Sequence, residues 1–328
     1  MKIVEPSYQI IDRDNTLNPA QKIERVGRVC YRSEDKTTLT SAIPFVKRLI
    51  DNGHEAMLEH ASILFTMTSI GFETMRRICS LYEECTGKPC FLRRSYHPAA
   101  VFQGIVSGNI RAWRDLVLFA AHRGGDDVVF PYGIFHLWTD FPEFFFDCPP
   151  ADEKPCLGAM GILDTTGFLR HGSPDQVQRH YSLTVQFDVD IAVARELCRH
   201  RLASHAGAST RYCDYANGKF GGETTAVMPS DPFNTDWVRA ARYAEEKYLS
   251  QRQDGIPPEI ARSALTLSTL GQHVMTATLE QWKHIFALRA LDKTGKAHPQ
   301  MKQVMLPLYQ ECKAMFPQEF GGMEDALV

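Results

Sequence analysis

The chain has 328 residues, of which 44% are hydrophobic. Its formal net charge is −3, from 36 Lys and Arg residues and 39 Asp and Glu residues. This size suits one large domain or two modest ones of an ordinary globular protein. The charge balance excludes a global basic field for nucleic acid or an anionic membrane. No apolar run is long enough to span a membrane, and residues 1–9 lack the apolar core of a signal peptide.

The nine cysteines are scattered along the chain and form no Cys-x-x-Cys pair. We therefore expect a cytoplasmic protein with reduced thiols, which are buried and inert rather than catalytic. Cys198, His200, His205 and Cys213 offer a metal-binding alternative. Their spacing fits no standard zinc pattern, so we expect no metal site.

The sequence pattern of the N-terminal third of the chain predicts alternating strands and helices. Residues 1–17 predict a first strand, and residues 62–68 a second, short one. Apolar residues at helical spacing predict helices over 19–31 and 41–52, and Gly53 is suited to end the second helix. From Ser69 onward the pattern predicts helices over 72–82 and 110–121, and loops over 123–127, 141–150 and 172–175.

Residues 182–191 carry the clearest local pattern in the chain. Five apolar residues alternate with polar ones over this stretch: Leu183, Val185, Phe187, Val189 and Ile191. A period of two predicts a half-buried β-strand. Residues 191–203 then predict a helix, on which Glu196, Arg199 and His200 share one face because they are spaced i, i+3 and i+4.

The C-terminal part is predicted to be mainly helical. Residues 215–223 form a turn-rich connector, and helices are expected over 237–251, 257–266, 279–291 and 298–314. The last helix carries an apolar stripe, which we assign to the core and not to a cofactor site: Met301, Val304, Met305, Leu308 and Cys312.

A cluster of cations follows the predicted strand and helix. Arg199, His200 and Arg201 are consecutive, and Ser209 and Arg211 follow within ten residues. Forked guanidiniums, an imidazole and a hydroxyl suit a phosphate-bearing ligand. The alternative is a solvated basic face, but an amphipathic strand leads directly into the cluster, which favours a ligand site.

The pattern Arg-His-Arg, seven residues, then Ser resembles the signature of the flavin-dependent thymidylate synthases, the ThyX family. Further segments are similar to that family and occur in its order: Gly-His-Glu…Glu-His at 53–65, Ser-Thr-Arg-Tyr at 209–212, Lys-Phe-Gly at 219–221, Pro-Pro-Glu-Ile-Ala-Arg at 257–262, Leu-Arg-Ala at 288–290 and Ala-His-Pro-Gln at 297–300. The resemblance covers residues 20–67 and 180–316. It implies an α/β fold of the α+β type, a twisted and mostly antiparallel sheet packed with helices, in a homotetramer. We expect a single domain over 1–328, interrupted by a long insert at about 68–179.

The resemblance also implies an activity, the reductive methylation of dUMP to dTMP with FAD, methylenetetrahydrofolate and NAD(P)H. The implied dUMP-binding residues are Glu196, Arg199, Ser209, Thr210, Arg211, Arg262 and Arg289. Arg289 faces the uracil ring, where a guanidinium stabilises developing charge, and is the implied catalytic residue. The implied FAD-binding residues are Glu59, Arg199, His200, Arg201 and His284. His54 matches a further position of the N-terminal segment. No nucleic-acid or membrane partner is expected.

The sequence departs from the family pattern at three places. Ala206, Gly207 and Ala208 replace a polar triplet, which removes hydrogen bonds of about 0.5–1.5 kcal/mol each and is expected to open space beside the sugar. Ala56 replaces a Ser or Thr near the flavin. Glu280 stands where a cation often meets the FAD diphosphate, which reverses a charge at an anionic ligand.

Two questions stay open on the sequence alone. Residues 107–114 resemble the family's flavin helix, so Asn109, Arg111 and Arg114 could compensate at the cofactor pocket, although we favour chance similarity to an ordinary amphipathic helix. Besides thymidylate synthesis, two alternatives are a flavin-dependent C5 methylase or hydroxymethylase of another pyrimidine nucleotide, and an inactive nucleotide- or flavin-binding protein of the same fold.

Overall fold

The computed structural model describes residues 1–14, 16–123, 130–150, 158–217, 220–229 and 235–324. Its strands are β1 Lys2–Val4, β2 Ser7–Ile10, β3 Ser62–Met67, β4 Arg93–Tyr96, β5 Gly104–Asn109, β6 Met160–Ile162, β7 Ser182–Asp190, β8 Ser204–Gly207, β9 Thr225–Val227 and β10 Leu270–Thr278. Its α-helices are α1 Pro19–Tyr31, α2 Ala42–Asp51, α3 Ser69–Thr86, α4 Ile110–Arg123, α5 His136–Thr139, α6 Pro142–Phe145, α7 Thr165–His171, α8 Pro174–His180, α9 Ile191–Leu197, α10 Thr235–Gln253, α11 Pro258–Ala261, α12 Leu279–Arg289, α13 Pro299–Met315 and α14 Pro317–Phe320. Short 3₁₀ helices are η1 Glu34–Lys36, η2 Glu55–His60 and η4 Arg262–Ala264.

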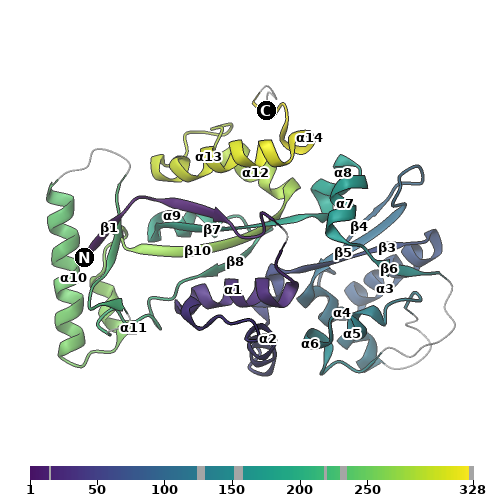
Figure 1. Ribbon diagram of the computed structural model, residues 1–328, viewed down its shortest axis with the longest axis horizontal. Helices are drawn as coiled ribbons and strands as arrows, with labels where there is room; N and C mark the ends of the chain where they lie inside the picture. Colours follow the sequence, from purple (N-terminus) through teal and green to yellow (C-terminus); the bar gives the residue numbers. More distant parts are fainter. Residues whose placement is uncertain (15, 124–129, 151–157, 218–219, 230–234, 325–328) are drawn as a thin grey trace.

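The centre of the molecule is a four-stranded antiparallel sheet in the order β2-β7-β10-β8 (Figure 1). Strand β7 pairs with β10 along its whole length, from Asp190 opposite Leu270 to Ser182 opposite Thr278. The alternating residues of β7 explain its place, because Leu183, Val185 and Phe187 are completely buried. Helices α1 and α2 lie on one side of this sheet, and α12 and α13 lie on the other (Figure 1).

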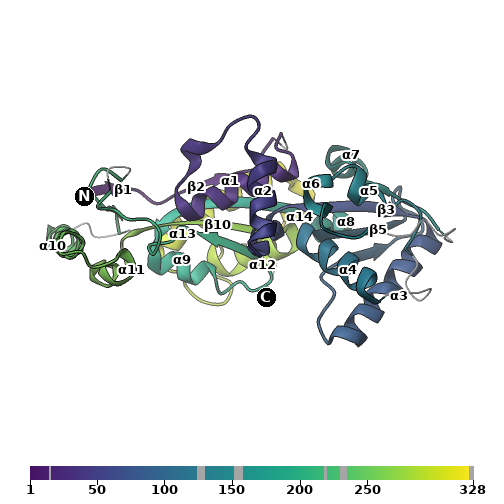
Figure 2. The same cartoon turned by 90° about the horizontal axis from the view of Figure 1, so that it is seen from below.

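A second four-stranded antiparallel sheet, in the order β4-β5-β3-β6, lies at one end of the long axis. Helices α3 and α4 pack beside it, as both views show (Figure 1, Figure 2). At the other end, β1 and β9 form a short parallel pair next to α10. None of the described helices is long and apolar enough to cross a membrane.

A chain of buried polar groups ties η2 to the central sheet. The Nδ1 of His60 lies 2.8 Å from the hydroxyl of Thr276, which lies 2.8 Å from the hydroxyl of Thr184 on the neighbouring strand. The backbone N–H of Thr184 donates to Asp12, and Asp12 accepts from Lys22 of α1. Because His60 is fully buried, this network holds η2, which carries Glu59, in one position against the sheet.

The mixed fold of helices and antiparallel strands confirms the predicted α/β class. The strand over 182–191 is confirmed, as are the helices at 19–31 and 298–314, and all five residues of the Met-rich stripe of α13 are buried. The predicted helices at 41–52, 72–82, 110–121, 237–251 and 279–291 are present as α2, α3, α4, α10 and α12, with shifted ends. In α2 the apolar residues Val46, Leu49 and Ile50 are buried, whereas Ile43 is 51% exposed.

Several local predictions were wrong. The helix expected over 191–203 ends at Leu197, because the chain turns there and enters β8, whose residues pair with β10. The single N-terminal strand is two strands that belong to different sheets. The expected helix over 257–266 is two short helices, α11 and η4, and the expected loop over 141–150 contains the short helix α6. Residues 124–127 of one expected loop and residues 218–219 of the connector lie outside the described residues.

The cysteines are more varied than the sequence predicted. Cys79, Cys148, Cys213 and Cys312 are buried, as expected, but Cys85 and Cys198 are exposed. All the described cysteines carry free thiols, and Cys198 lies at the end of α9, within the cation cluster.

Candidate functional site

The signature segment is positioned by a capped junction between β7 and α9. Asp190 ends β7, and its side chain accepts from the backbone N–H of Val193 at 2.7 Å, which caps the helix. Helix α9 is only seven residues long. Arg199, His200 and Arg201 therefore lie on the turn between α9 and β8, beside the edge strand of the central sheet.

Three of the predicted residues meet across two elements. The Nη1 of Arg289, in the last turn of α12, donates to Oε2 of Glu196 at 2.9 Å, and its Nε donates to Nε2 of His200 at 3.3 Å. Burial lowers the pKa of His200 to about 4, helped by the positive charge of Arg289 and by His284. His200 is therefore neutral at physiological pH, and its ring accepts a hydrogen bond from the guanidinium.

Glu59 joins η2 to two other parts of the chain. Its Oε1 accepts from Nη1 of Arg111 at 2.8 Å, and its Oε2 accepts from the hydroxyl of Ser204 at 3.2 Å. Arg111 belongs to α4, the helix whose sequence resembles the family's flavin helix. The structure thus places one residue of that helix beside a predicted flavin contact.

The other two residues of that motif have structural roles. The side chain of Asn109 accepts from the backbone N–H of Ala112 at 2.8 Å at the start of α4. Arg114 is completely buried and forms ion pairs with Glu55 at 3.1 Å and Asp147 at 2.7 Å. Arg114 is therefore not free to contact a cofactor, whereas Asn109 uses its Oδ1 to cap α4.

The remaining nucleotide-binding candidates form a second group. Nη1 of Arg262, in η4, donates to the hydroxyl of Thr210 at 3.2 Å, and Ser209 accepts from the backbone N–H of Arg211 at 3.3 Å. The backbone of Ser209 also donates to the carbonyl of Cys30 at the end of α1. The exposed Arg211 lies 5.3 Å over the ring of Tyr212.

A pocket of about 460 Å³ opens next to this second group. Tyr31 and Tyr212 stand at its wall with their ring centres 5.6 Å apart. Arg111 lies at the same pocket, and the full lining is Gly27, Cys30, Tyr31, Leu49, Gly53, His54, Glu55, Ala56, Met57, Arg111 and Tyr212. His54 and Ala56, both singled out from the sequence, therefore line a cavity large enough for part of a planar ligand.

Arg199 and Arg201 present open cationic groups. Both residues are exposed, and neither forms an ion pair with an acidic side chain in the part of the chain that the structure describes. His284 is exposed on α12, close enough to His200 for its charge to affect the pKa of that ring. Unpaired guanidiniums on a turn suit an anionic ligand, because they gain charge-assisted hydrogen bonds without breaking an existing pair.

The departures from the family pattern have specific positions. Ala206 is buried against Val274 and the α1 residues Val26 and Val29, so the space that we expected to open beside the sugar is absent at this position. Gly207 is exposed and pairs with His273 of β10. Glu280 is exposed in a hollow of about 260 Å³, together with Asp175 and Arg179 of α8. It lies nine residues before Arg289, roughly 13 Å along the helix axis.

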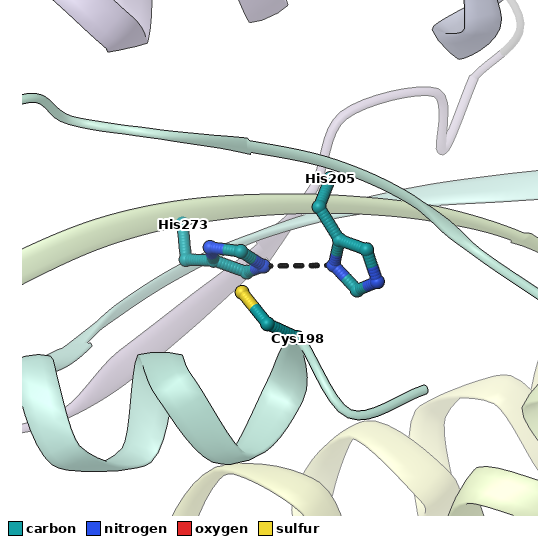
Figure 3. A group of neighbouring side chains, drawn as sticks. All are labelled: Cys198, His205 and His273. Atoms are coloured by element: carbon teal, nitrogen blue, oxygen red, sulfur yellow. Dashed lines mark hydrogen bonds between the residues drawn. The ribbon is translucent and has the colours of Figure 1, made fainter. Parts of the chain in front are cut away.

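Cys198, His205 and His273 come together from three elements, as Figure 3 shows. Their potential ligand atoms all lie within 4.8 Å of one another, and Nδ1 of His205 lies 3.0 Å from Nε2 of His273. Burial lowers the pKa of both imidazoles, that of His273 to about 3. His273 was not among the predicted residues, because strand β10 was not predicted from the sequence. The other two residues of the metal alternative lie elsewhere, Cys213 in a cluster with Tyr215 and Tyr248, and His200 against Arg289.

Comparison with known proteins gives a consistent result. A family model described as "Thymidylate synthase complementing protein", Thy1, matches residues 13–85 and 162–318. A "Probable flavin-dependent thymidylate synthase" of Paramecium bursaria Chlorella virus 1 is 24% identical over 159 residues, 44% of this chain and 70% of the relative. A "Flavin-dependent thymidylate synthase" of Geobacter sulfurreducens is 28% identical over 138 residues, 40% of this chain and 56% of the relative.

The solved structures similar to this chain include a UMP/dUMP methylase, PolB from Streptomyces cacaoi, bound with 5-Br dUMP. The match has 22% identity and a TM-score of 0.38, and it covers 48% of this chain and 76% of that one. A score this low supports no conclusion about function. The family model leaves residues 86–161 unmatched, and the predicted insert at about 68–179 within a single domain stays a prediction.

Proposed function

The chain belongs to the family of thymidylate synthase complementing proteins, the flavin-dependent thymidylate synthases, and from this membership we propose that it methylates C5 of dUMP to form dTMP. The proposed co-substrates are methylenetetrahydrofolate, as the one-carbon donor, and NAD(P)H, as the reductant. The observation that carries the proposal is the contact of Arg289 with Glu196 and His200, which brings three separately predicted residues into one cluster.

The chain's own residues suit the recognition of a pyrimidine nucleotide. Glu196 and His200 fix the guanidinium of Arg289 from two sides, so its remaining N–H groups point in a set direction. Such a fixed donor stabilises negative charge that develops on a pyrimidine carbonyl when C5 reacts. Thr210, Arg211 and Arg262 supply the hydroxyl and guanidinium groups for the nucleotide phosphate.

The donor set also fits FAD. Arg199 and Arg201 are exposed without acidic partners among the described residues, and their guanidiniums would hold the diphosphate. Glu59, His200 and His284 complete the proposed set of contacts, and Arg111 supports it by orienting Glu59. When bound and reduced by NAD(P)H, the flavin would supply the hydride that reduces the transferred one-carbon unit. Glu280 lies in a hollow beside α8, but it also stands one turn before His284 on α12, so its charge remains a departure from the family pattern.

One alternative keeps a specific observation in its favour. Gly207 is exposed, and a Cβ atom there would have Nδ1 of His273 as its nearest neighbour, at 3.4 Å. If the nucleotide sugar lies beside β8, as the family resemblance implies, one additional hydroxyl group would meet no side chain at position 207. This favours testing UMP, or another pyrimidine nucleotide, next to dUMP.

The test combines complementation with a product assay. Expression of the gene in a thymidine auxotroph should restore growth, and the purified protein should be yellow and convert dUMP to dTMP. Conversion of UMP but not dUMP, without rescue, would replace the proposal with the sibling reaction. A colourless protein without rescue would support the inactive binding protein. Arg195→Ala, on the exposed side of α9, is the matched control for arginine substitutions in the site.

A further inference from the structure

The three residues Cys198, His205 and His273 form a ligand set that the proposed reaction does not use. Cys198 follows the last turn of α9, His205 lies in the edge strand β8, and His273 lies in β10. Figure 3 shows the thiol and both rings directed toward one point between the helix end and the sheet. We infer that Cys198, His205 and His273 bind one zinc ion through side chains that are not among the proposed flavin and nucleotide contacts.

The separations are close to those of a tetrahedral zinc site. Zinc–nitrogen bonds of about 2.0–2.1 Å and zinc–sulfur bonds of about 2.3 Å put neighbouring ligands roughly 3.3–3.6 Å apart. The two ring nitrogens are 3.0 Å apart, and the Sγ atom lies within 4.8 Å of both. Cys198 is exposed, so its side chain can move the remaining distance without disturbing the core.

The hydrogen bonds prepare His205 as a ligand. Its Nε2 lies 3.0 Å from the carbonyl oxygen of His200. A carbonyl only accepts, so Nε2 carries the hydrogen, and Nδ1, which faces His273, carries the lone pair. Metal-binding histidines commonly donate their other N–H group to a backbone carbonyl in this way, which fixes the tautomer and the ring orientation.

Binding has a simple proton balance. In the metal-free protein Nε2 of His273 donates to Nδ1 of His205. When zinc binds, this hydrogen moves to Nδ1 of His273, and the thiol of Cys198 releases its proton to solvent. His273 is only 4% exposed, and its Nδ1 lies beside Gly207, which has no side chain to obstruct the new N–H group. Because Cys198 is exposed, the fourth zinc position is open to water.

The chemistry of the ligands selects the ion. One thiolate and two imidazoles favour zinc over magnesium or calcium, which prefer oxygen ligands. Arg199, His200 and Arg201 lie on the turn between α9 and β8. A zinc ion would link the start of this turn, at Cys198, to the central sheet, at His205 and His273. Zinc binding is therefore expected to stabilise the protein by mass action.

The experiment measures zinc without substrate, so its outcome does not depend on the proposed reaction. Protein freed of metal with a chelator is titrated with Zn²⁺ against a chromophoric competitor, and its thermal midpoint is recorded with and without the ion. We expect one zinc per chain and a higher midpoint. Cys198→Ser should weaken zinc binding on the order of tenfold or more, while Cys85→Ser, at another exposed cysteine, should bind like the wild type.

A second readout identifies the ligands directly. Substitution with Co²⁺ should produce a thiolate-to-cobalt charge-transfer band in a difference spectrum, which removes the contribution of any bound flavin. The band should be absent in Cys198→Ser and weakened in His205→Gln, with flavin content serving as the check on folding. Equal zinc binding by Cys198→Ser and Cys85→Ser, or less than about one zinc for every five chains in the wild type, would overturn the inference.

Discussion

Arg289 is the residue on which the proposed chemistry depends most. Its guanidinium already has a defined orientation, because Glu196 and His200 accept from two of its nitrogens. Arg199 differs in that its side chain is exposed and unpaired among the described residues. The two arginines should therefore respond differently to truncation.

Arg289→Ala is expected to lower turnover by about a hundred- to a thousandfold while flavin stays bound. The reason is that a donor aimed at charge in the transition state affects the rate more than ground-state binding. Arg199→Ala should also lose flavin, because Arg199 is proposed to contact both ligands. Steady-state kinetics and the flavin absorbance of the purified variants measure both effects. Equal flavin loss in the two variants, or full activity of Arg289→Ala, would show that the uracil-facing residue is another one.

At the scale of the elements, α1 is held by a buried ion pair. The Nε of Arg28 donates to Oε1 of Glu24 at 2.8 Å, both side chains are at most 7% exposed, and the hydroxyl of Ser41 donates to Oε2 of Glu24 at 3.0 Å. The pair fixes α1 to the segment before α2. Helix α1 in turn provides Tyr31 to the pocket.

Glu24→Ala is therefore expected to lower the free energy of unfolding by about 3–5 kcal/mol, because it leaves the buried charge of Arg28 unpaired. Urea unfolding followed by circular dichroism measures the change. Glu73→Ala, which breaks the exposed pair with Arg76 on α3, is the matched control and should cost at most about 1 kcal/mol. Similar losses in the free energy of unfolding for the two variants would contradict the expected difference between the buried and the exposed ion pair.

Helix α8 is fastened to the second sheet by a buried histidine. Nδ1 of His180 lies 2.8 Å from the hydroxyl of Ser107 on β5, and Nε2 lies 2.8 Å from that of Ser95 on β4. Burial lowers the pKa of His180 to about 3, and the charge of Arg93 adds to this effect. Between about pH 3 and 6.5 the unfolded chain therefore binds a proton at this residue that the folded protein does not bind.

The lowered pKa of His180 sets the direction in which the free energy of unfolding depends on pH. Because the unfolded state binds the additional proton, the free energy of unfolding falls as the pH decreases from 6.5, by up to about 1.4 kcal/mol per pH unit for one proton. In His180→Gln the slope of the free energy of unfolding against pH should be shallower by up to about 1.4 kcal/mol per pH unit, which is the contribution of one proton. Urea denaturation at several pH values provides the measurement, with His122→Gln at an exposed histidine as control. A slope in His180→Gln equal to that of the wild type would contradict the assignment of this proton to His180.

At the scale of the whole molecule, the segments that carry the site residues also carry exposed apolar residues. Leu202 is 70% exposed next to Arg201, and Tyr212, Ile260 and Leu267 are also exposed. Exposed apolar groups around polar site residues are typical of surfaces that a partner covers. They are the basis for testing the homotetramer that the family resemblance implies, in which several subunits complete each site.

We expect light scattering coupled to size-exclusion chromatography to give the mass of a tetramer. Leu202→Asp should shift the protein toward smaller species, because it places a charge in the proposed interface. Leu39→Asp is the matched control, since Leu39 is 97% exposed in a loop before α2. A monomer that converts dUMP at the same concentration would remove the inference of shared sites.

The sequence by itself determined the family, the fold class and most long elements, because these depend on local patterns. The period-two alternation of β7, the apolar spacing of α1 and α13, and the order of the signature segments are properties of neighbouring residues. Strand β10 was not predicted, although it pairs with β7 over its whole length.

Only the tertiary structure decided which distant residues meet. The end of α9 at Leu197 follows from the pairing of β8 with β10, a long-range contact that overrides the local preference for helix. The same pairing places His205 against His273, and α12 brings Arg289 to Glu196, 93 residues earlier in the chain. Ala206 shows the reverse effect, because a residue interpreted as open space beside a ligand is buried in the core. Contacts of this kind depend on strand register and helix packing, which short segments of sequence do not specify.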